Sequence, residues 1–144
     1  MTELKADAVF EGGGVKGIAL VGAIAVTEEK GYSFENVAGT SAGAIVASLV
    51  AAGYSAVELG EIMRSAEYSK FLDKDVVDKI PLLGPALSLG FEKGIYEGKY
   101  FEEWLRGHLA KKGKRDFGDL VMDQYKDDPR YRYRLRVITA DISL

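Results

Sequence analysis

The stretch that decides the fold is residues 6–53, ADAVFEGGGVKGIALVGAIAVTEEKGYSFENVAGTSAGAIVASLVAAG. It opens with a short apolar run, Ala6–Phe10, which stops at a glutamate and three glycines and therefore predicts a buried strand entering a turn. The following residues, Lys16–Lys30, favour a helix, and Gly31 is a plausible end for it.

The same succession is then repeated. Tyr32–Ala38 predicts a second strand, Gly39–Gly43 a second glycine turn, and Ala44–Ala52, apolar on every face, a fully buried helix that ends at Gly53. Two units of strand, glycine turn and helix are typical of a parallel α/β sheet whose faces are covered by helices.

Signals in the rest of the chain are more scattered. Ser55 and Glu58 form a capping-box pattern that predicts a short helix. Residues 68–96 hold prolines, glycines and isolated apolar side chains, which indicate an irregular insertion or cap region. Lys99–Lys112 regains helical periodicity, and the alternation within Tyr131–Ile142 predicts a strand that enters the sheet.

Composition narrows the function classes. The 144 residues are 47% hydrophobic and 28% charged with a net charge of −3, as in one soluble domain with no general attraction for nucleic acid. The absence of cysteine, together with a single histidine, His108, excludes disulfides, thiolate zinc sites and multi-histidine metal sites. No signal peptide or membrane-spanning stretch is recognisable, so we expect a cytoplasmic protein, with contact at a membrane surface left open.

The second glycine turn, GTSAG, fits a nucleophile elbow. In such an elbow a strand folds sharply back into a helix, so only small residues fit two positions before and after the serine, as Gly39 and Gly43 do. Ser41 would then present its hydroxyl at the positive end of a helix dipole, which favours nucleophilic chemistry. The alternative is that Ser41 merely caps the following helix.

The first glycine turn supports two interpretations. The consecutive glycines Gly12, Gly13 and Gly14 allow several backbone N–H groups to converge on one point, as an oxyanion hole requires. The same stretch to Gly17 also matches the G-x-G-x-x-G dinucleotide fingerprint, with Glu35 as the acidic residue for a ribose. A nucleotide-binding module is therefore the alternative, although it leaves the GTSAG turn unexplained.

Taken together, EGGGVKG at residues 11–17 and GTSAG at residues 39–43 resemble the patatin-like phospholipase family. The closing TADIS segment is similar at lower specificity. The resemblance implies a three-layer α/β/α sandwich with a mostly parallel central sheet. It also implies a lipid acyl hydrolase that uses a serine–aspartate dyad, needs no cofactor and acts on a lipid or other ester.

The resemblance further implies the roles of individual residues. Ser41 would be the nucleophile, and the amides of Gly13 and Gly14, with those of Gly12 and Ala42, would donate to the oxyanion. Lys16, the basic residue of the glycine loop, would meet an anionic head group or hold the loop in place, with a solvated structural charge as the alternative.

One departure from the family pattern concerns the base. The dyad aspartate of the family stands in an Asp-Gly turn, and this chain has no Asp-Gly pair. We therefore expect residues 1–144 to form one incomplete patatin-like α/β domain, inactive or weakly active alone, whose aspartate lies outside the chain. Within the chain, Asp141 is the candidate at the sheet edge where ligands bind. A non-catalytic partial domain is the remaining alternative.

Three further patterns have ordinary structural interpretations. We expect His108 to be a surface or edge residue, which disfavours a serine–histidine–aspartate triad. The apolar stripe that includes Tyr100, Phe101 and Trp104 is expected to pack in the core. Arginines and tyrosines alternate over residues 130–136, as they do in RNA and anionic-membrane binders, but a strand with one solvated face explains them equally well.

Overall fold

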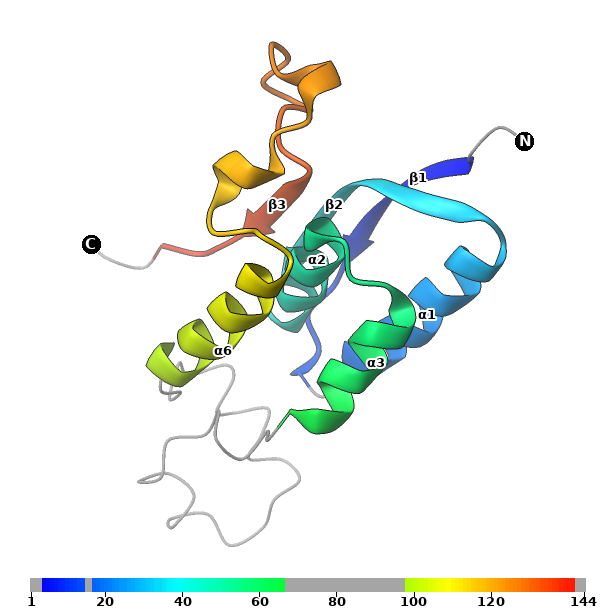
Figure 1. Cartoon of the computed structure of the whole chain (residues 1–144), viewed down its shortest axis with the longest axis vertical. Helices are drawn as coiled ribbons and strands as arrows, with labels where there is room; N and C mark the ends of the chain where they lie inside the picture. The colour runs from blue at the N-terminus through cyan, green and yellow to red at the C-terminus, as the bar shows by residue number, and fades with distance from the viewer. Residues whose placement is uncertain (1–3, 15–16, 67–97, 142–144) are drawn as a thin grey trace, which may run out of the picture.

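The computed structural model describes residues 4–14, 17–66 and 98–141 (Figure 1). Three strands, β1 (Leu4–Phe10), β2 (Tyr32–Thr40) and β3 (Leu135–Ile138), form one sheet in the order β1-β2-β3. Both pairings are parallel. The predicted α/β class with a parallel sheet is confirmed.

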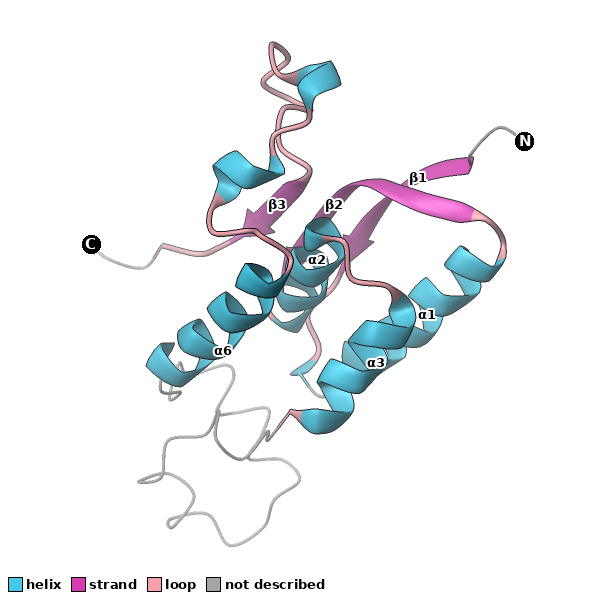
Figure 2. Cartoon of the chain, viewed as in Figure 1, coloured by secondary structure: helices cyan, strands magenta, loops and turns pink. Residues whose placement is uncertain are grey.

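The helices around this sheet are shown in Figure 2. They are α1 (Gly17–Glu29), α2 (Ala42–Ala52), α3 (Ala56–Ser65) and α6 (Gly98–Lys111), with short 3-10 helices η3 (Phe117–Leu120) and η4 (Asp123–Tyr125). Helix α2 packs across all three strands, α1 lies against α3 and α2, and α6 contacts α2. No helix of the described ranges is long and apolar enough to cross a membrane.

These helices cover one face of the sheet. Because the strands follow one another in a single direction, right-handed crossovers place the connecting helices on the same side. On that side Val37 is 1% exposed and Leu135 6%, whereas on the opposite face Val9 is 83% exposed and Ile138 64%. The described residues therefore comprise the sheet and one helical layer of the α/β arrangement.

The core is centred on α2, as its uniformly apolar sequence predicts. From Val46 to Ala52 every residue is buried, and Leu49 is completely inaccessible to solvent. The one polar side chain in that run, Ser48, donates its hydroxyl to the carbonyl of Ala44 at 2.7 Å, so its burial leaves no unmatched group. Gly53 ends the helix at φ 96°, in the left-handed region that favours glycine.

The helix after α2 starts with the capping box read from the sequence. Glu58 N donates to Ser55 Oγ at 3.3 Å, and Ser55 N donates to Glu58 Oε2 at 2.8 Å. Both residues therefore satisfy backbone donors that the first turn of a helix leaves unpaired. The insertion predicted at residues 68–96 lies outside the described residues.

One expectation was wrong. Of the strand predicted over Tyr131–Ile142, the described residues form only Leu135–Ile138, because the turn at Asp128 accepts backbone hydrogen bonds from Tyr131 and Arg132 and keeps the chain away from the sheet. His108, expected to be a surface or edge residue, is half-buried and packs its ring 4.7 Å from that of Trp104. Trp104 itself packs against the core, as predicted, together with Leu105 and Leu109.

Candidate active site

The two glycine turns meet at one edge of the sheet. Phe10, at the end of β1, pairs with Gly39 near the end of β2, so the residues that follow each strand emerge side by side. Thr40 pairs with Ile138 at the end of β3, which brings the third strand to the same edge. Ligands of parallel α/β sheets bind at this carboxyl edge.

Ser41 stands at the turn between β2 and α2 in a strained conformation. Its φ is 51° and its ψ −129°, and it is the one non-glycine residue with a positive φ in the described part of the chain. A conformation this uncommon costs about 1–3 kcal/mol, and structures retain it where the surroundings enforce it. The Ser41 side chain makes no capping hydrogen bond to α2, which removes the interpretation of this residue as a simple cap.

Two glycines, Gly39 and Gly43, make the tight turn around Ser41 possible. A β-carbon on Gly39 would lie 2.6 Å from the backbone nitrogen of Ala44 and would collide with the backbone of Gly43. A β-carbon on Gly43 would collide with the carbonyl of Phe10 and lie 2.5 Å from that of Glu11. Gly39 therefore allows the turn to fold back on itself, and Gly43 allows the start of α2 to touch the end of β1. The sequence predicts the requirement for a small residue at Gly39 within the turn, but it does not reveal the contact between Gly43 and the end of β1.

The first glycine loop lies directly against Ser41. A β-carbon on Gly12 would come within 2.9 Å of Ser41 Cβ and 3.6 Å of its Oγ. Gly14 has a φ of 57°, another conformation suited to glycine. The backbone at Gly12 thus passes beside the serine hydroxyl, where a backbone N–H can serve an oxyanion formed on a substrate attacked by that hydroxyl.

Helix α2 adds a favourable field at the same place. Its first turn carries no acidic side chain, so the positive end of its dipole is not neutralised there. Ala42, the first residue of α2, is buried and lies beside Gly17, the first residue of α1. Two helices therefore begin next to Ser41. Lys16, expected to contribute to this site, lies outside the described residues.

The candidate bases lie at different distances from this edge. Asp141 follows β3 by three residues and so belongs to the carboxyl edge, and its side chain is exposed. His108 contacts Tyr54, which follows the far end of α2. The 11 residues of α2 span about 16 Å, so His108 is too distant to act on Ser41. A triad through His108 is excluded by this arrangement.

The structure argues against dinucleotide binding at the first glycine loop, because Glu35 does not lie near that loop. Glu35 lies in the first half of β2, four residues before Gly39, and a strand rises about 3.3 Å per residue. Its carboxylate accepts hydrogen bonds from Lys5 Nζ at 2.9 Å and from Gln124 Nε2 at 3.3 Å, both away from the glycine loop. Glu35 is therefore not positioned to bind a ribose next to Gly12–Gly17.

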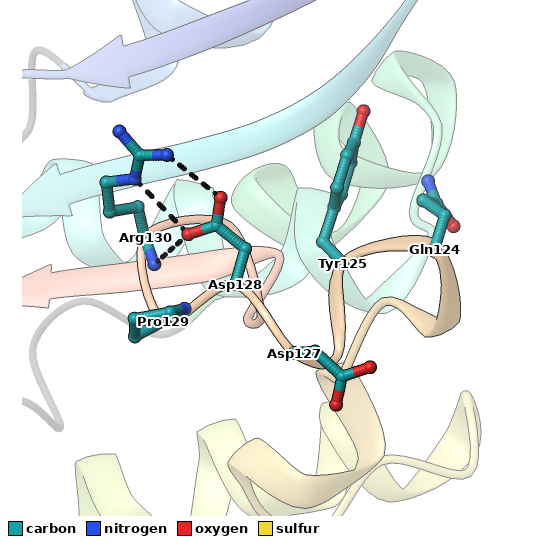
Figure 3. A pocket seen from close by; sticks show the side chains of 6 residues that line it. All are labelled: Gln124, Tyr125, Asp127, Asp128, Pro129 and Arg130. Atoms are coloured by element: carbon teal, nitrogen blue, oxygen red, sulfur yellow. Dashed lines mark hydrogen bonds and ion pairs between the residues drawn. The ribbon is translucent and has the colours of Figure 1, made fainter.

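A separate hollow of about 590 Å³ lies on the segment that carries η4 (Figure 3). Arg130 there binds Asp128 through its guanidinium at 3.1 and 3.2 Å and through its backbone N–H at 2.9 Å. These hydrogen bonds hold the pKa of Asp128 below its usual value. The charges of Asp128 and Arg130 are matched within one turn, which indicates a structural role for this pair.

Comparisons with known proteins identify the family of the chain. A family model described as patatin-like phospholipase matches residues 8–138. The uncharacterized protein YqhO of Bacillus subtilis (strain 168) is 46% identical over 138 residues, which are 95% of this chain and 44% of YqhO. The chain thus spans less than half the length of this curated relative.

Solved structures share the fold. The crystal structure of the type III effector protein ExoU matches 92% of this chain and 33% of its own length, with a TM-score of 0.57 at 21% identity. The heterodimeric ExoU–SpcU complex from the type III secretion system of Pseudomonas aeruginosa gives a TM-score of 0.46 at 23% identity, over 94% of this chain and 30% of the other. The first of these likenesses confirms the fold expected from the two motifs.

Proposed function

The chain belongs to the patatin-like phospholipase family, and we propose that it carries the nucleophile and the oxyanion hole of a serine lipid acyl hydrolase. The observation that carries the proposal is the position of Ser41, strained at the tip of its turn with Gly12 against its side chain. This arrangement has a direct use in acyl transfer, because the nucleophile and the donors for the oxyanion must lie on either side of one carbonyl group.

The reaction proceeds in two steps. Ser41 Oγ attacks the carbonyl carbon of a lipid ester while a base removes its proton, and the backbone N–H groups of Gly12, Gly13, Gly14 and Ala42 stabilise the negative oxygen. The alcohol leaves with a proton, and an acyl group remains on Ser41. Water then attacks the acyl-enzyme with the help of the same base, which releases the fatty acid and restores the serine.

The base of the proposed dyad is an aspartate. The family pattern assigns it to an Asp-Gly turn outside residues 1–144, and Asp141 is the competing candidate inside the chain. Lys16, next to the glycine loop, is proposed to bind an anionic head group of the substrate. Ala42 contributes its backbone N–H, which α2 directs toward the reacting carbonyl.

An irreversible probe tests this proposal. The chain is treated with a fluorophosphonate and its intact mass measured, with Ser41→Ala and Ser65→Ala alongside and circular dichroism to confirm folding. Ser65 is a matched control because it is another exposed serine, on α3, whose hydroxyl donates to Ile62 O at 3.1 Å. We expect one adduct on the complete protein and on its Ser65→Ala variant, none on Ser41→Ala, and at most weak labelling of residues 1–144 alone.

Equal labelling of the wild type and of Ser41→Ala would contradict the proposal, because it would show that another residue reacts. A folded wild type without an adduct is the result expected if the base lies outside residues 1–144, and the same test on the complete protein then decides. A complete protein without an adduct on Ser41 would overturn the proposal and favour a non-catalytic domain. If the wild type is labelled, Asp141→Asn distinguishes the two bases, because only a base inside the chain would make labelling depend on Asp141.

A further inference from the structure

The junction between α6 and the turn after α2 is built from a small polar and aromatic cluster. Tyr54, in the turn between α2 and α3, donates its hydroxyl to the carbonyl of His108 on α6 at 2.8 Å. Lys112, one turn later on the chain, donates to Glu58 Oε1 at 2.7 Å and lies 4.5 Å above the ring of Tyr54. These contacts fasten the C-terminal end of α6 to the start of α3.

The imidazole of His108 is enclosed in this cluster. Its ring lies edge-on to Trp104 at 4.7 Å and to Tyr54 at 6.3 Å. Its Nδ1 is buried and has no hydrogen-bond partner among the described residues. A neutral imidazole tolerates this environment at small cost, whereas an imidazolium would have a buried N–H without an acceptor.

The charged groups facing His108 do not offer that acceptor. The neighbours Lys111, the last residue of α6, and Lys112, which follows it, are both cationic. From α3, Glu58 approaches, but its carboxylate already accepts from Lys112 and from the backbone of Ser55. From the intervening turn comes the phenol of Tyr54, which is neutral at these pH values because its ordinary pKa is about 10 and burial raises that pKa further. A third positive charge here, on His108, would be repelled by the two lysines and left without a free anion.

We propose that this junction is an acid-sensitive latch, in which protonation of His108 releases the C-terminal half of α6 from the turn between α2 and α3. Burial, with a further contribution from Lys111, lowers the pKa of His108 in the folded state. The folded protein therefore binds fewer protons than the released state at pH values between the two pKa values, so acid favours release. The latch does not depend on the proposed function, although α6 packs on the helix that follows Ser41.

Trp104 and His108 are the only tryptophan and the only histidine of the chain, so the spectroscopic signals of both side chains are assigned without ambiguity. NMR of the single imidazole gives its pKa, and amide hydrogen exchange compares the protection of α6 with that of α1 from about pH 7.5 to about pH 5. We expect a pKa below the ordinary value of about 6.5 and a selective loss of α6 protection as the pH falls through that interval. Each unit by which the pKa of His108 is lowered in the folded state corresponds to about a tenfold loss of α6 protection at pH values below both pKa values.

His108→Phe serves as the matched variant, because it keeps an aromatic ring against Trp104 and cannot be protonated. We expect the protection of its α6 to be the same at both pH values, relative to α1. Two results would overturn the proposal: an imidazole pKa at or above about 6.5 in the folded wild type, or α6 protection in the wild type that does not change with pH. Both are measured on the wild type, so the test stands even if the variant folds poorly.

Discussion

Replacing Gly43 by alanine should separate the nucleophile from the oxyanion loop without removing either. The added methyl group would lie 2.5 Å from the carbonyl oxygen of Glu11 and would collide with that of Phe10. An ordinary contact between carbon and oxygen is about 3.3–3.6 Å, so the end of β1 and the start of α2 must move apart by about 1 Å. The glycine loop, which continues directly from Glu11, must move with them.

The expected effect is large for chemistry and moderate for stability. A misplacement of about 1 Å at a reaction centre costs about 100-fold in rate, and loss of one oxyanion donor costs about 100- to 1000-fold. Overpacking of this kind typically destabilises a protein by about 1–3 kcal/mol. We therefore expect Gly43→Ala to fold, to unfold at lower denaturant concentration, and to react with a fluorophosphonate at least about 100-fold more slowly than the wild type.

The assay is the rate of probe labelling followed by intact mass, with Gly22→Ala as the control. Gly22 is an exposed glycine inside α1, and a β-carbon there would meet nothing within 4 Å. The control should label at the wild-type rate and gain about 0.5–1 kcal/mol of stability, because alanine is the better helix former. Wild-type labelling by folded Gly43→Ala would refute the argument that this contact positions the glycine loop.

Three other substitutions test the interactions that support the site. Ser55→Ala removes the N-cap of α3 and should lower the free energy of unfolding by about 1 kcal/mol in urea titrations, whereas an unchanged value would show that Glu58 alone satisfies the helix start. The hydrogen bond from Lys112 holds the pKa of Glu58 at about 2, so the stability from this carboxylate is present above its unfolded pKa of about 4.5 and is lost as the pH falls toward 2. Glu58→Gln should flatten the dependence of stability on pH over that interval, and a dependence as steep as in the wild type would mean that the pair contributes nothing. Leu49→Ala leaves a cavity beneath the sheet and should cost about 2–5 kcal/mol, measured as a shift of the urea midpoint at constant slope, and a shift near zero would mean that α2 is not the centre of the core.

Local signals predicted most of the region around Ser41. The strand that ends at Phe10, the glycine turn around Ser41 and the capping box at Ser55 are each specified within a few neighbouring residues. The structure contains all three, although β2 continues through Gly39 to Thr40, two residues beyond its predicted end. The family resemblance follows from the same two glycine motifs. These features are predictable because turns and caps require particular residue types at particular positions.

Features that depend on distant partners were not predictable in the same way. The length of β3 is determined by the residues of β2 that are available for pairing and by the turn at Asp128. The alternation of polar and apolar residues alone therefore predicted a strand that is too long. The environment of His108 depends on Tyr54, which is 54 residues away in the sequence. The contact between Gly43 and the end of β1 is also nonlocal, although the glycine itself is part of the motif. The base of the proposed dyad stays a prediction.

The glycine loop and the serine turn belong to one short strand–helix–strand unit, residues 4–41, closed by α2. Only the short loops at either end of α1 need to be ordered to bring them together, so the entropy of loop closure is small. In a chain synthesised from its N-terminus, we expect this unit to assemble once α2 has left the ribosome, before β3 has been made. The strained serine would then be an early product of folding, held by neighbours in the sequence rather than by the completed sheet.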